Sequence, residues 1–154
     1  MEPPLHIVLY QPEIPPNTGN IGRLCSAAGI RLHLIEPLGF SLDEKQVRRA
    51  GMDYWAEVDL RRWASLEDLI ASAPGARLFY FSTKASRVIW DEAFQAGDYL
   101  VFGPETRGLP ESILAENAAR CLRLPMQSGR SLNLSSAAAI AAYEAARQIG
   151  WLNG

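Results

Sequence analysis

The chain is short of cysteine and histidine and has no long hydrophobic run, and each shortage excludes a class of protein. Cys25 and Cys121 are its only cysteines and share no short spacing, so we expect reduced thiols and no disulfide framework. His6 and His33 are the only histidines, so we expect no zinc or other metal site. Apolar runs such as residues 99–102 are far too short to cross a bilayer, so we expect no membrane partner.

Lysine is also scarce, although basic residues are not. Only Lys45 and Lys84 of the 15 basic residues are lysine, and the net charge is −2, which gives no general sign of nucleic-acid binding. Arginine suits bidentate contacts with phosphate and stacking on bases, but an arginine bias also follows from a GC-rich genome. The N-terminus has no basic segment followed by an apolar stretch, so we expect no signal peptide and a cytoplasmic protein.

What the chain does have is a regular alternation of strand and helix patterns. Its 154 residues are 48% hydrophobic and contain no repeat or linker, which predicts a single domain over residues 1–154. The βαβα order predicts an α/β fold with a mostly parallel sheet flanked by helices on both faces. We expect strands at residues 5–11, 31–35, 57–60, 77–81, 99–103 and 120–124, and helices at residues 20–28, 41–50, 65–73, 110–117 and 135–149, with a helical turn at 90–95.

A first polar loop, residues 17–23 (NTGNIGR), follows the first predicted strand and opens the first predicted helix. Gly19 and Gly22 permit close backbone approach or unusual dihedral angles, but they lack the spacing of a dinucleotide-binding G-x-G-x-x-G loop. Asn17 and its polar neighbours can cap the helix. Arg23 then falls in the first turn, either as an ordinary surface residue or as part of a site.

A second polar loop, residues 103–110 (GPETRGLP), directly follows an apolar strand. Its two glycines, two prolines and two opposite charges predict an ordered loop whose backbone groups can bind the polar edge of a ligand. Glu105 can pair with an arginine or accept a hydrogen bond from an amine. The alternative is a tight turn with a local Glu105–Arg107 ion pair of the frequent and weak surface kind.

The most informative stretch is residues 124–145 (LPMQSGRSLNLSSAAAIAAYEA). A polar loop with Arg130, Ser131 and Asn133 separates a short apolar run from an Ala-rich helix. Ligands of open α/β sheets bind at the carboxyl ends of strands, which is where this loop falls. One helix cap needs one Ser or Asn, and several crowd here, so we interpret the excess as a site and leave Ser135 among the caps.

A basic patch, made of Lys45, Arg48 and Arg49, lies on a short predicted helix. It is either a solvated helix face or a set of phosphate contacts, and the residues alone leave both interpretations open.

At the three polar loops the sequence resembles the SPOUT superfamily of S-adenosylmethionine-dependent RNA methyltransferases, in its ribose 2′-O-methylating branch. NTGNIGR resembles the first motif of that branch, FGPETRGLP the second and LPMQSGRSLNLSSAAAIAAYEA the third. The segments IVLYQPEIPPNTGNIGRLC and RRAGMDYW resemble the corresponding segments of enzymes that methylate the wobble nucleotide of tRNA, cytidine or uridine 34. The resemblance covers nearly the whole chain, although residues 126–131 depart from the Pro- or Asp-containing loop of many relatives.

The resemblance implies a SPOUT-type fold with a C-terminal trefoil knot, closed by the last helix, and a homodimer to which that helix contributes. It also implies S-adenosyl-L-methionine as the methyl donor. Mainly backbone groups would hold this donor, at Phe81, Gly103, Leu124, Met126, Ser131 and Leu132.

The resemblance assigns catalysis to Arg23, Ser131, Asn133 and Glu105. Arg23 matches the proposed catalytic arginine of the family. A neutral arginine is costly, since the guanidinium pKa is above about 12, so we expect Arg23 to stabilise the developing alkoxide electrostatically. Ser131 and Asn133 would orient Arg23, the donor or the ribose, and Glu105 would fix the charge geometry of the site.

The implied RNA partner is the anticodon stem-loop of tRNA. Two alternatives stay open, namely 2′-O-methylation of another tRNA or rRNA position, and a non-catalytic RNA- or nucleotide-binding module of the same fold. The candidate RNA-contacting residues are Arg23, Lys45, Arg48, Arg49, Arg107 and Arg130.

Overall fold

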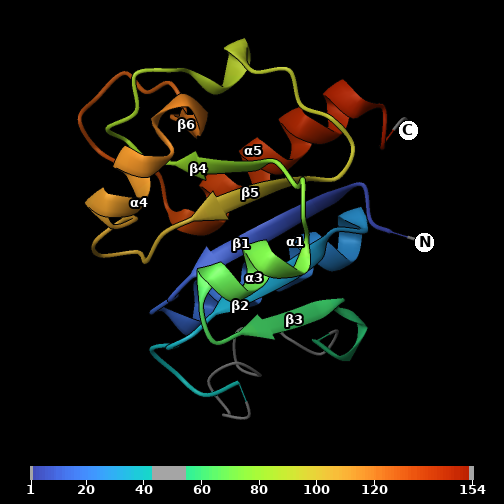
Figure 1. Cartoon of the computed structure of the whole chain (residues 1–154). Coiled ribbons are helices and arrows are strands. Elements are labelled where there is room, and N and C mark those ends of the chain that lie inside the picture. The colour runs from blue at the N-terminus through green and yellow to red at the C-terminus, as the bar shows by residue number, and fades with distance from the viewer. Residues whose placement is uncertain (1, 43–54, 153–154) are drawn as a thin grey trace.

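A parallel β-sheet organises the chain (Figure 1). The computed structural model describes residues 2–42 and 55–152. Within these residues the sheet has six strands in the order β3-β2-β1-β5-β4-β6, and all neighbouring strands are parallel. The strands are β1 (Leu5–Tyr10), β2 (Arg31–Ile35), β3 (Leu60–Trp63), β4 (Leu78–Phe81), β5 (Asp98–Phe102) and β6 (Cys121–Leu122).

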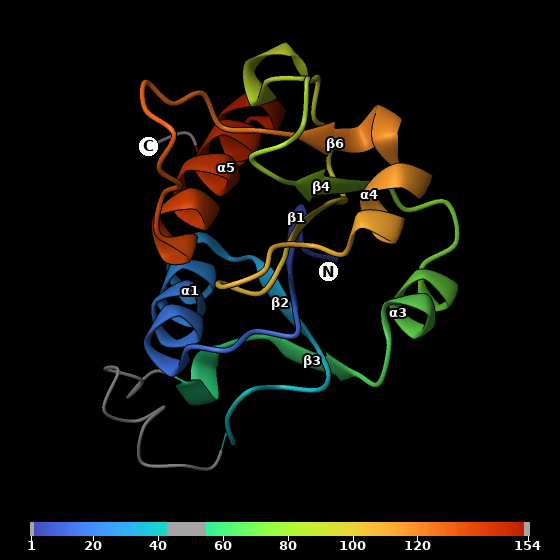
Figure 2. The same cartoon turned by 90° about the vertical axis from the view of Figure 1, so that its left-hand side faces the viewer.

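Helices cover both faces of the sheet, as the sequence predicted. Figure 2 shows α1 and α5 on one side of the sheet and α3 and α4 on the other. None of the helices in the described ranges is both long and apolar enough to cross a membrane. The helices are α1 (Pro15–Ala28), α3 (Leu66–Ser72), α4 (Glu111–Glu116) and α5 (Leu134–Ile149), with short 3₁₀ helices η1 (Trp55–Glu57), η2 (Ile89–Asp91) and η3 (Ala118–Arg120).

The core lies on both faces of the central strands, as expected for a parallel sheet. Along β1, Ile7 belongs to the apolar cluster under α1 and α5, whereas Val8 belongs to the cluster under α3. Helix α1 packs against α5, and both helices bury small residues, such as Gly22 on α1 and Ala141 on α5. Gly19 and Gly22 are buried and do not have positive φ angles, so unusual dihedral angles are not the reason for these two glycines.

The first helix begins earlier than predicted, so the expected caps are wrong. Helix α1 starts at Pro15 and its N-cap residue is Ile14, whose side chain makes no capping hydrogen bond. Proline is favoured at this first helical position because it has no N–H to leave unpaired. Asn17 and its polar neighbours therefore lie inside the helix, and Arg23 lies about two turns beyond its start, not in the first turn.

Other predicted boundaries also need correction. The strand expected at residues 57–60 is wrong, because η1 extends to Glu57 and β3 begins only at Leu60. The strand expected at 120–124 shrinks to two residues, followed by one isolated bridge from Arg123 to Val88. The turn expected at 90–95 is η2, and the helix expected at 41–50 lies mostly outside the described residues.

The sheet topology places the start of α1 and the other two polar loops at one edge. The chain runs outward from β1 to β2 and β3, and then builds β4, β5 and β6 on the other side of β1. The strands are parallel, so their carboxyl ends meet at the same edge, where ligands bind in open α/β sheets. The trefoil knot expected for the C-terminal part stays a prediction.

Candidate functional site

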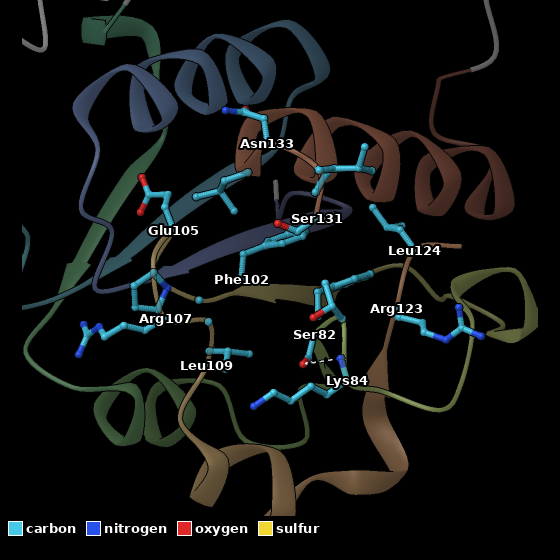
Figure 3. Close-up of a pocket in the computed structure, with 18 of the residues that line it drawn as sticks. Ser82, Lys84, Phe102, Glu105, Arg107, Leu109, Arg123, Leu124, Ser131 and Asn133 are labelled. Atoms are coloured by element: carbon cyan, nitrogen blue, oxygen red, sulfur yellow. Dashed lines mark hydrogen bonds between the residues drawn. The ribbon is translucent and has the colours of Figure 1, made fainter. Parts of the chain in front are cut away.

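A cavity of about 510 Å³ lies at this edge of the sheet (Figure 3). The ends of β4 and β5, residues 103–109, residues 122–126 and the start of α5 line it. In Figure 3, Ser131 and Asn133 lie toward α1 and α5, whereas Lys84 and Leu109 lie on the opposite side. All six residues expected to hold the methyl donor line this cavity, namely Phe81, Gly103, Leu124, Met126, Ser131 and Leu132.

The cavity combines aromatic surface with closely approaching backbone. The rings of Phe81 and Phe102 stack with centroids 4.8 Å apart and an interplanar angle of 12°. A Cβ atom at Gly103 would lie 2.3 Å from the backbone nitrogen of Leu109, so only glycine fits this fold of the loop. The lining therefore offers apolar surface beside backbone N–H and C=O groups, which suits a ligand with a flat base and a polar edge and fits the expected donor.

Three side chains from distant segments form a hydrogen-bonded chain beside the cavity. The Asn17 side-chain amide on α1 donates from Nδ2 to Oε2 of Glu105 at 3.2 Å. Asn133 donates from Nδ2 to Oδ1 of Asn17 at 3.1 Å. This chain joins the start of α1, the loop after β5 and the start of α5, which are the three polar loops that the sequence singled out.

Glu105 contacts the segment before α1 and not its neighbour Arg107. Oε1 accepts from the backbone N–H of Glu13 and Oε2 accepts from that of Ile14, both at 2.8 Å. The alternative of a local Glu105–Arg107 ion pair is therefore wrong, since Arg107 Nε lies 3.9 Å from Oε2 of Glu13 instead. Both oxygens of Glu105 accept hydrogen bonds from the segment at the start of α1, so this side chain joins the two segments.

Asn133 is the N-cap of α5, a role for which Ser135 had been expected. Its Oδ1 accepts from the backbone N–H of Ser135 at 2.9 Å and from the Ser135 hydroxyl at 2.6 Å. The same amide donates to Asn17, so Asn133 both caps the helix and belongs to the site. Asn133 and Ser131 line the cavity together, as expected.

Arg23 does not line the cavity, although the helix that carries it does. Ile14 and Asn17, at the start of α1, are lining residues, whereas the Arg23 side chain lies farther along the helix on its exposed face. The structure therefore brings Glu105, Ser131 and Asn133 together and leaves Arg23 outside the cavity that they share.

The expected RNA-contacting residues are scattered. Arg107 lines the cavity, and Arg130 is exposed in the loop before Ser131. Two further basic residues, Lys84 and Arg123, line the cavity without having been expected. Lys45, Arg48 and Arg49 lie outside the described residues.

Asn17 is the site residue that sequence reasoning missed, because it was interpreted as a helix cap. The Pro15–Pro16 pair was the signal that could have found it, since proline favours the first turn of a helix. A helix that starts at Pro15 buries Asn17 inside its first turn, and a buried amide needs hydrogen-bond partners.

Neither histidine belongs to the site. His6 and His33 are both buried, and their Nδ1 and Nε2 atoms lie 2.9 Å apart. Burial is the main cause that lowers the pKa of His6 to about 4 and that of His33 to about 3. In the described part of the chain, no group of three or more His, Cys, Asp or Glu residues is arranged to hold a metal ion.

Comparisons with known proteins agree with this geometry. Residues 4–143 match the model of the SpoU rRNA Methylase family. The tRNA (cytidine(34)-2′-O)-methyltransferase of Methylovorus glucosotrophus is 54% identical over 144 residues, which cover 92% of this chain and 94% of that protein. A solved structure from "Structural insights into the 2-OH methylation of C/U34 on tRNA" is 51% identical with a TM-score of 0.89, covering 94% of this chain and 95% of that one. The AdoMet-bound rRNA methyltransferase from Sinorhizobium meliloti is 28% identical with a TM-score of 0.80, covering 96% of this chain and 57% of that one.

Proposed function

The chain belongs to the SpoU rRNA Methylase family, and we propose that it transfers a methyl group from S-adenosylmethionine to the ribose 2′-hydroxyl of nucleotide 34 of tRNA, a cytidine or uridine. The observation that carries this proposal is the cavity at the carboxyl edge of the sheet. All six residues expected to hold the donor line it, together with Glu105 and Asn133. The relatives named for C34 or C/U34 methylation match this chain over nearly its whole length.

The donor, when bound, supplies a methyl group that is already activated by a positively charged sulfur. The chain must then place the ribose oxygen in line with that methyl group and help the hydroxyl to lose its proton. Correct placement alone can supply several kcal/mol of the barrier. The hydrogen-bonded chain Glu105–Asn17–Asn133 suits this task, since it fixes the walls of the cavity relative to α1.

Arg23 is the residue that we propose to stabilise the developing alkoxide. Both histidines are buried outside the cavity, so a histidine base is not at hand. The guanidinium keeps its charge, and a fixed positive charge lowers the energy of an oxygen that becomes negative. Because Arg23 lies on the exposed face of α1, the ribose would lie between that face and the mouth of the cavity.

We propose that the active form is a homodimer formed through the outer layer of α1 and α5. On α5, Ile140 is 41% exposed and Tyr143 is 50% exposed, on the side of the sheet that α1 shares (Figure 2). Large apolar side chains on one helix face favour contact with another protein surface. Contact between two such layers would place Arg23 near the boundary between the subunits.

The RNA substrate would contact basic residues around the mouth of the cavity. Arg107, Lys84 and Arg123 line the cavity, and Arg130 is exposed in the loop before Ser131, so basic side chains gather around its mouth on a chain of net charge −2. Two of them have acidic neighbours, since Lys84 pairs with Glu111 and Arg107 lies 3.9 Å from Glu13. Such local charges govern phosphate binding. The anticodon stem-loop is the part of tRNA that would carry nucleotide 34 to this surface.

The direct test is an assay on defined RNAs. We expect the purified protein to methylate a tRNA at the 2′-oxygen of C34 or U34, and to leave unmethylated a matched tRNA that carries 2′-deoxycytidine or 2′-deoxyuridine at 34. Methylation at another tRNA position or in rRNA would support the alternative substrate. A protein that binds no S-adenosylhomocysteine in calorimetry would be a non-catalytic module.

A further inference from the structure

No side chain of α1 itself caps its N-terminus, and Glu105 from another loop accepts N–H groups there instead. We call this loop, residues 103–109 after β5, the donor-binding loop. Ile14 makes no side-chain cap, Pro15 and Pro16 follow it, and the first turn has no acidic residue. The carboxylate of Glu105 instead accepts the backbone N–H groups of Glu13 and Ile14. A negative charge near the N-terminus of a helix interacts favourably with the helix dipole and stabilises the helix. The start of α1 therefore depends on the position of a loop that lines the cavity.

The contact is reciprocal, because Glu13 binds the same loop in return. Its Oε1 accepts from the backbone N–H of Thr106 at 2.9 Å and from the Thr106 hydroxyl at 2.8 Å. These hydrogen bonds, first the one from the backbone, lower the pKa of Glu13 below its usual value. We call the four hydrogen bonds that join Glu13 and Ile14 to Glu105 and Thr106 the reciprocal contact.

Gly39, in the loop after β2, packs against the backbone of Glu13. The backbone N–H of Gly39 donates to the carbonyl of Pro12 at 2.9 Å. A Cβ atom at Gly39 would lie 2.9 Å from Cα of Glu13, so the two backbones are already in close contact. Glu13 thus contacts Gly39 through its backbone and Thr106 through its side chain.

We propose that Glu13 is a positioning residue, which fixes Arg23 relative to the donor cavity through the reciprocal contact and helix α1. The helix is continuous from Pro15 to Arg23, so a displacement at its start moves Arg23 as well. The inference rests on the proposed function, because it assigns a role to Glu13 in the same methyl transfer. Because Glu105 and Thr106 line the cavity, we expect a ligand there to restrain the start of α1 through the same contact.

The kinetic test uses Glu13→Ala and Glu13→Gln. Both hydrogen bonds from Thr106 go to Oε1, an acceptor that glutamine keeps and alanine lacks. We expect Glu13→Ala to lower the single-turnover rate at saturating donor and tRNA by about 10- to 100-fold, the loss typical of a slightly misplaced group. Glu13→Gln should react close to the wild-type rate. Glu67→Ala, at an exposed acidic residue in the first turn of α3, is the matched control.

The structural test is amide hydrogen exchange, which needs no catalysis. In Glu13→Ala the amide of Thr106 should lose protection. Addition of S-adenosylhomocysteine should protect the amides of residues 18–23 in the wild type and in Glu13→Gln, but not in Glu13→Ala. This arm decides whether the cavity and α1 are coupled even if the wild type methylates no tRNA, an outcome that would overturn the proposed function alone.

Three results would overturn the inference. The first is a Glu13→Ala variant that reacts at the wild-type rate. The second is a Glu13→Ala variant whose defect disappears at saturating donor, which would confine Glu13 to donor binding. The third is a Glu13→Gln variant as slow as Glu13→Ala, because the hydrogen-bond acceptor would then not be what matters.

Discussion

Asn133 donates a hydrogen bond from Nδ2 to Oδ1 of Asn17 at 3.1 Å, across 116 residues of sequence. Asn17 donates in turn to Glu105, so each amide uses both its oxygen and its nitrogen. The two groups at the ends of this hydrogen-bonded series fix the direction of each hydrogen bond. The carboxylate of Glu105 can only accept, and the backbone N–H of Ser135 can only donate. The cap of α5, the first turn of α1 and the donor-binding loop therefore form one polar unit.

Substitution of Asn17 should damage this unit. Asn17→Ala leaves Glu105 and Asn133 each with one partner fewer, which costs about 1–3 kcal/mol in the free energy of unfolding. Asn17→Asp should cost more, because it places a second carboxylate 3.2 Å from that of Glu105. Urea unfolding measures both. Asn20→Ala, at an exposed position of the same helix, serves as control, and equal stability of all three variants would disprove the role of Asn17.

Gly103→Ala should weaken donor binding. The new Cβ would lie 2.3 Å from the Leu109 nitrogen and 2.5 Å from the carbonyl carbon of Gly108, so the loop that lines the cavity must move. We expect the affinity for S-adenosylhomocysteine in calorimetry to fall at least tenfold, about 1.4 kcal/mol. Gly129→Ala is the matched control, since a Cβ there meets nothing within 4 Å. Tight binding by Gly103→Ala would show that this loop does not shape the donor site.

Ile140→Asp should dissociate the proposed homodimer. Ile140 is 41% exposed on the outer face of α5, and a charge there would be buried without a partner in the dimer. Sedimentation should show dimers for the wild type and monomers for the variant. Ile70→Asp is the control, because Ile70 is 44% exposed on α3, on the other side of the sheet. A wild type that sediments as a monomer would contradict the proposed assembly.

The buried histidine pair should make the fold sensitive to acid. The Trp63 indole donates to Nδ1 of His33 at 3.0 Å, so the proton of His33 is on Nε2 and points to Nδ1 of His6. This arrangement needs two neutral rings. Burial lowers the pKa of His6 from 6.5 to about 4, and burial together with His6 lowers that of His33 to about 3.

The sign of the pH effect follows from proton counts. Between pH 6.5 and about 4 the unfolded chain binds protons on both histidines and the folded chain does not, so stability falls as the pH falls. The slope reaches at most about 2.7 kcal/mol per pH unit, or about 1.4 for each histidine. Urea unfolding from pH 7 to pH 5 measures this slope, and His6→Gln should roughly halve it. A slope near zero in the wild type would contradict neutral burial of the pair.

Local pattern predicted much of the fold. The strand at Arg31–Ile35 was predicted with its observed bounds, because Gly29 ends the helix before it and Pro37 closes it. The start of α1 was missed because Asn17 fits two roles, a helix cap and a buried helical residue, and the Pro15–Pro16 signal that favours the second was not used. The strand near residue 60 was placed three residues too early, since β3 is an edge strand whose two arginines disguise the pattern.

The site was predicted as a set of residues but not as a set of contacts. Residues such as Gly103 and Leu124 lie at the ends of strands that the hydrophobic pattern identifies. The resemblance of their loops to family motifs predicted that they share one site. The partners of Glu105 lie 88 to 92 residues away, so only the fold brings them within hydrogen-bond distance. The Glu13 carboxylate escaped notice for the same reason, because its partner Thr106 is 93 residues distant.

The most direct test of the account is to map ribose methylation in RNA from cells that lack this protein. The account predicts that the 2′-O-methyl group disappears from C34 or U34 of tRNA and that rRNA is unchanged. The wild-type chain should restore it, whereas Arg23→Ala should not, although that variant should still bind S-adenosylhomocysteine. Unchanged methylation at position 34, or a loss confined to another RNA, would contradict the account.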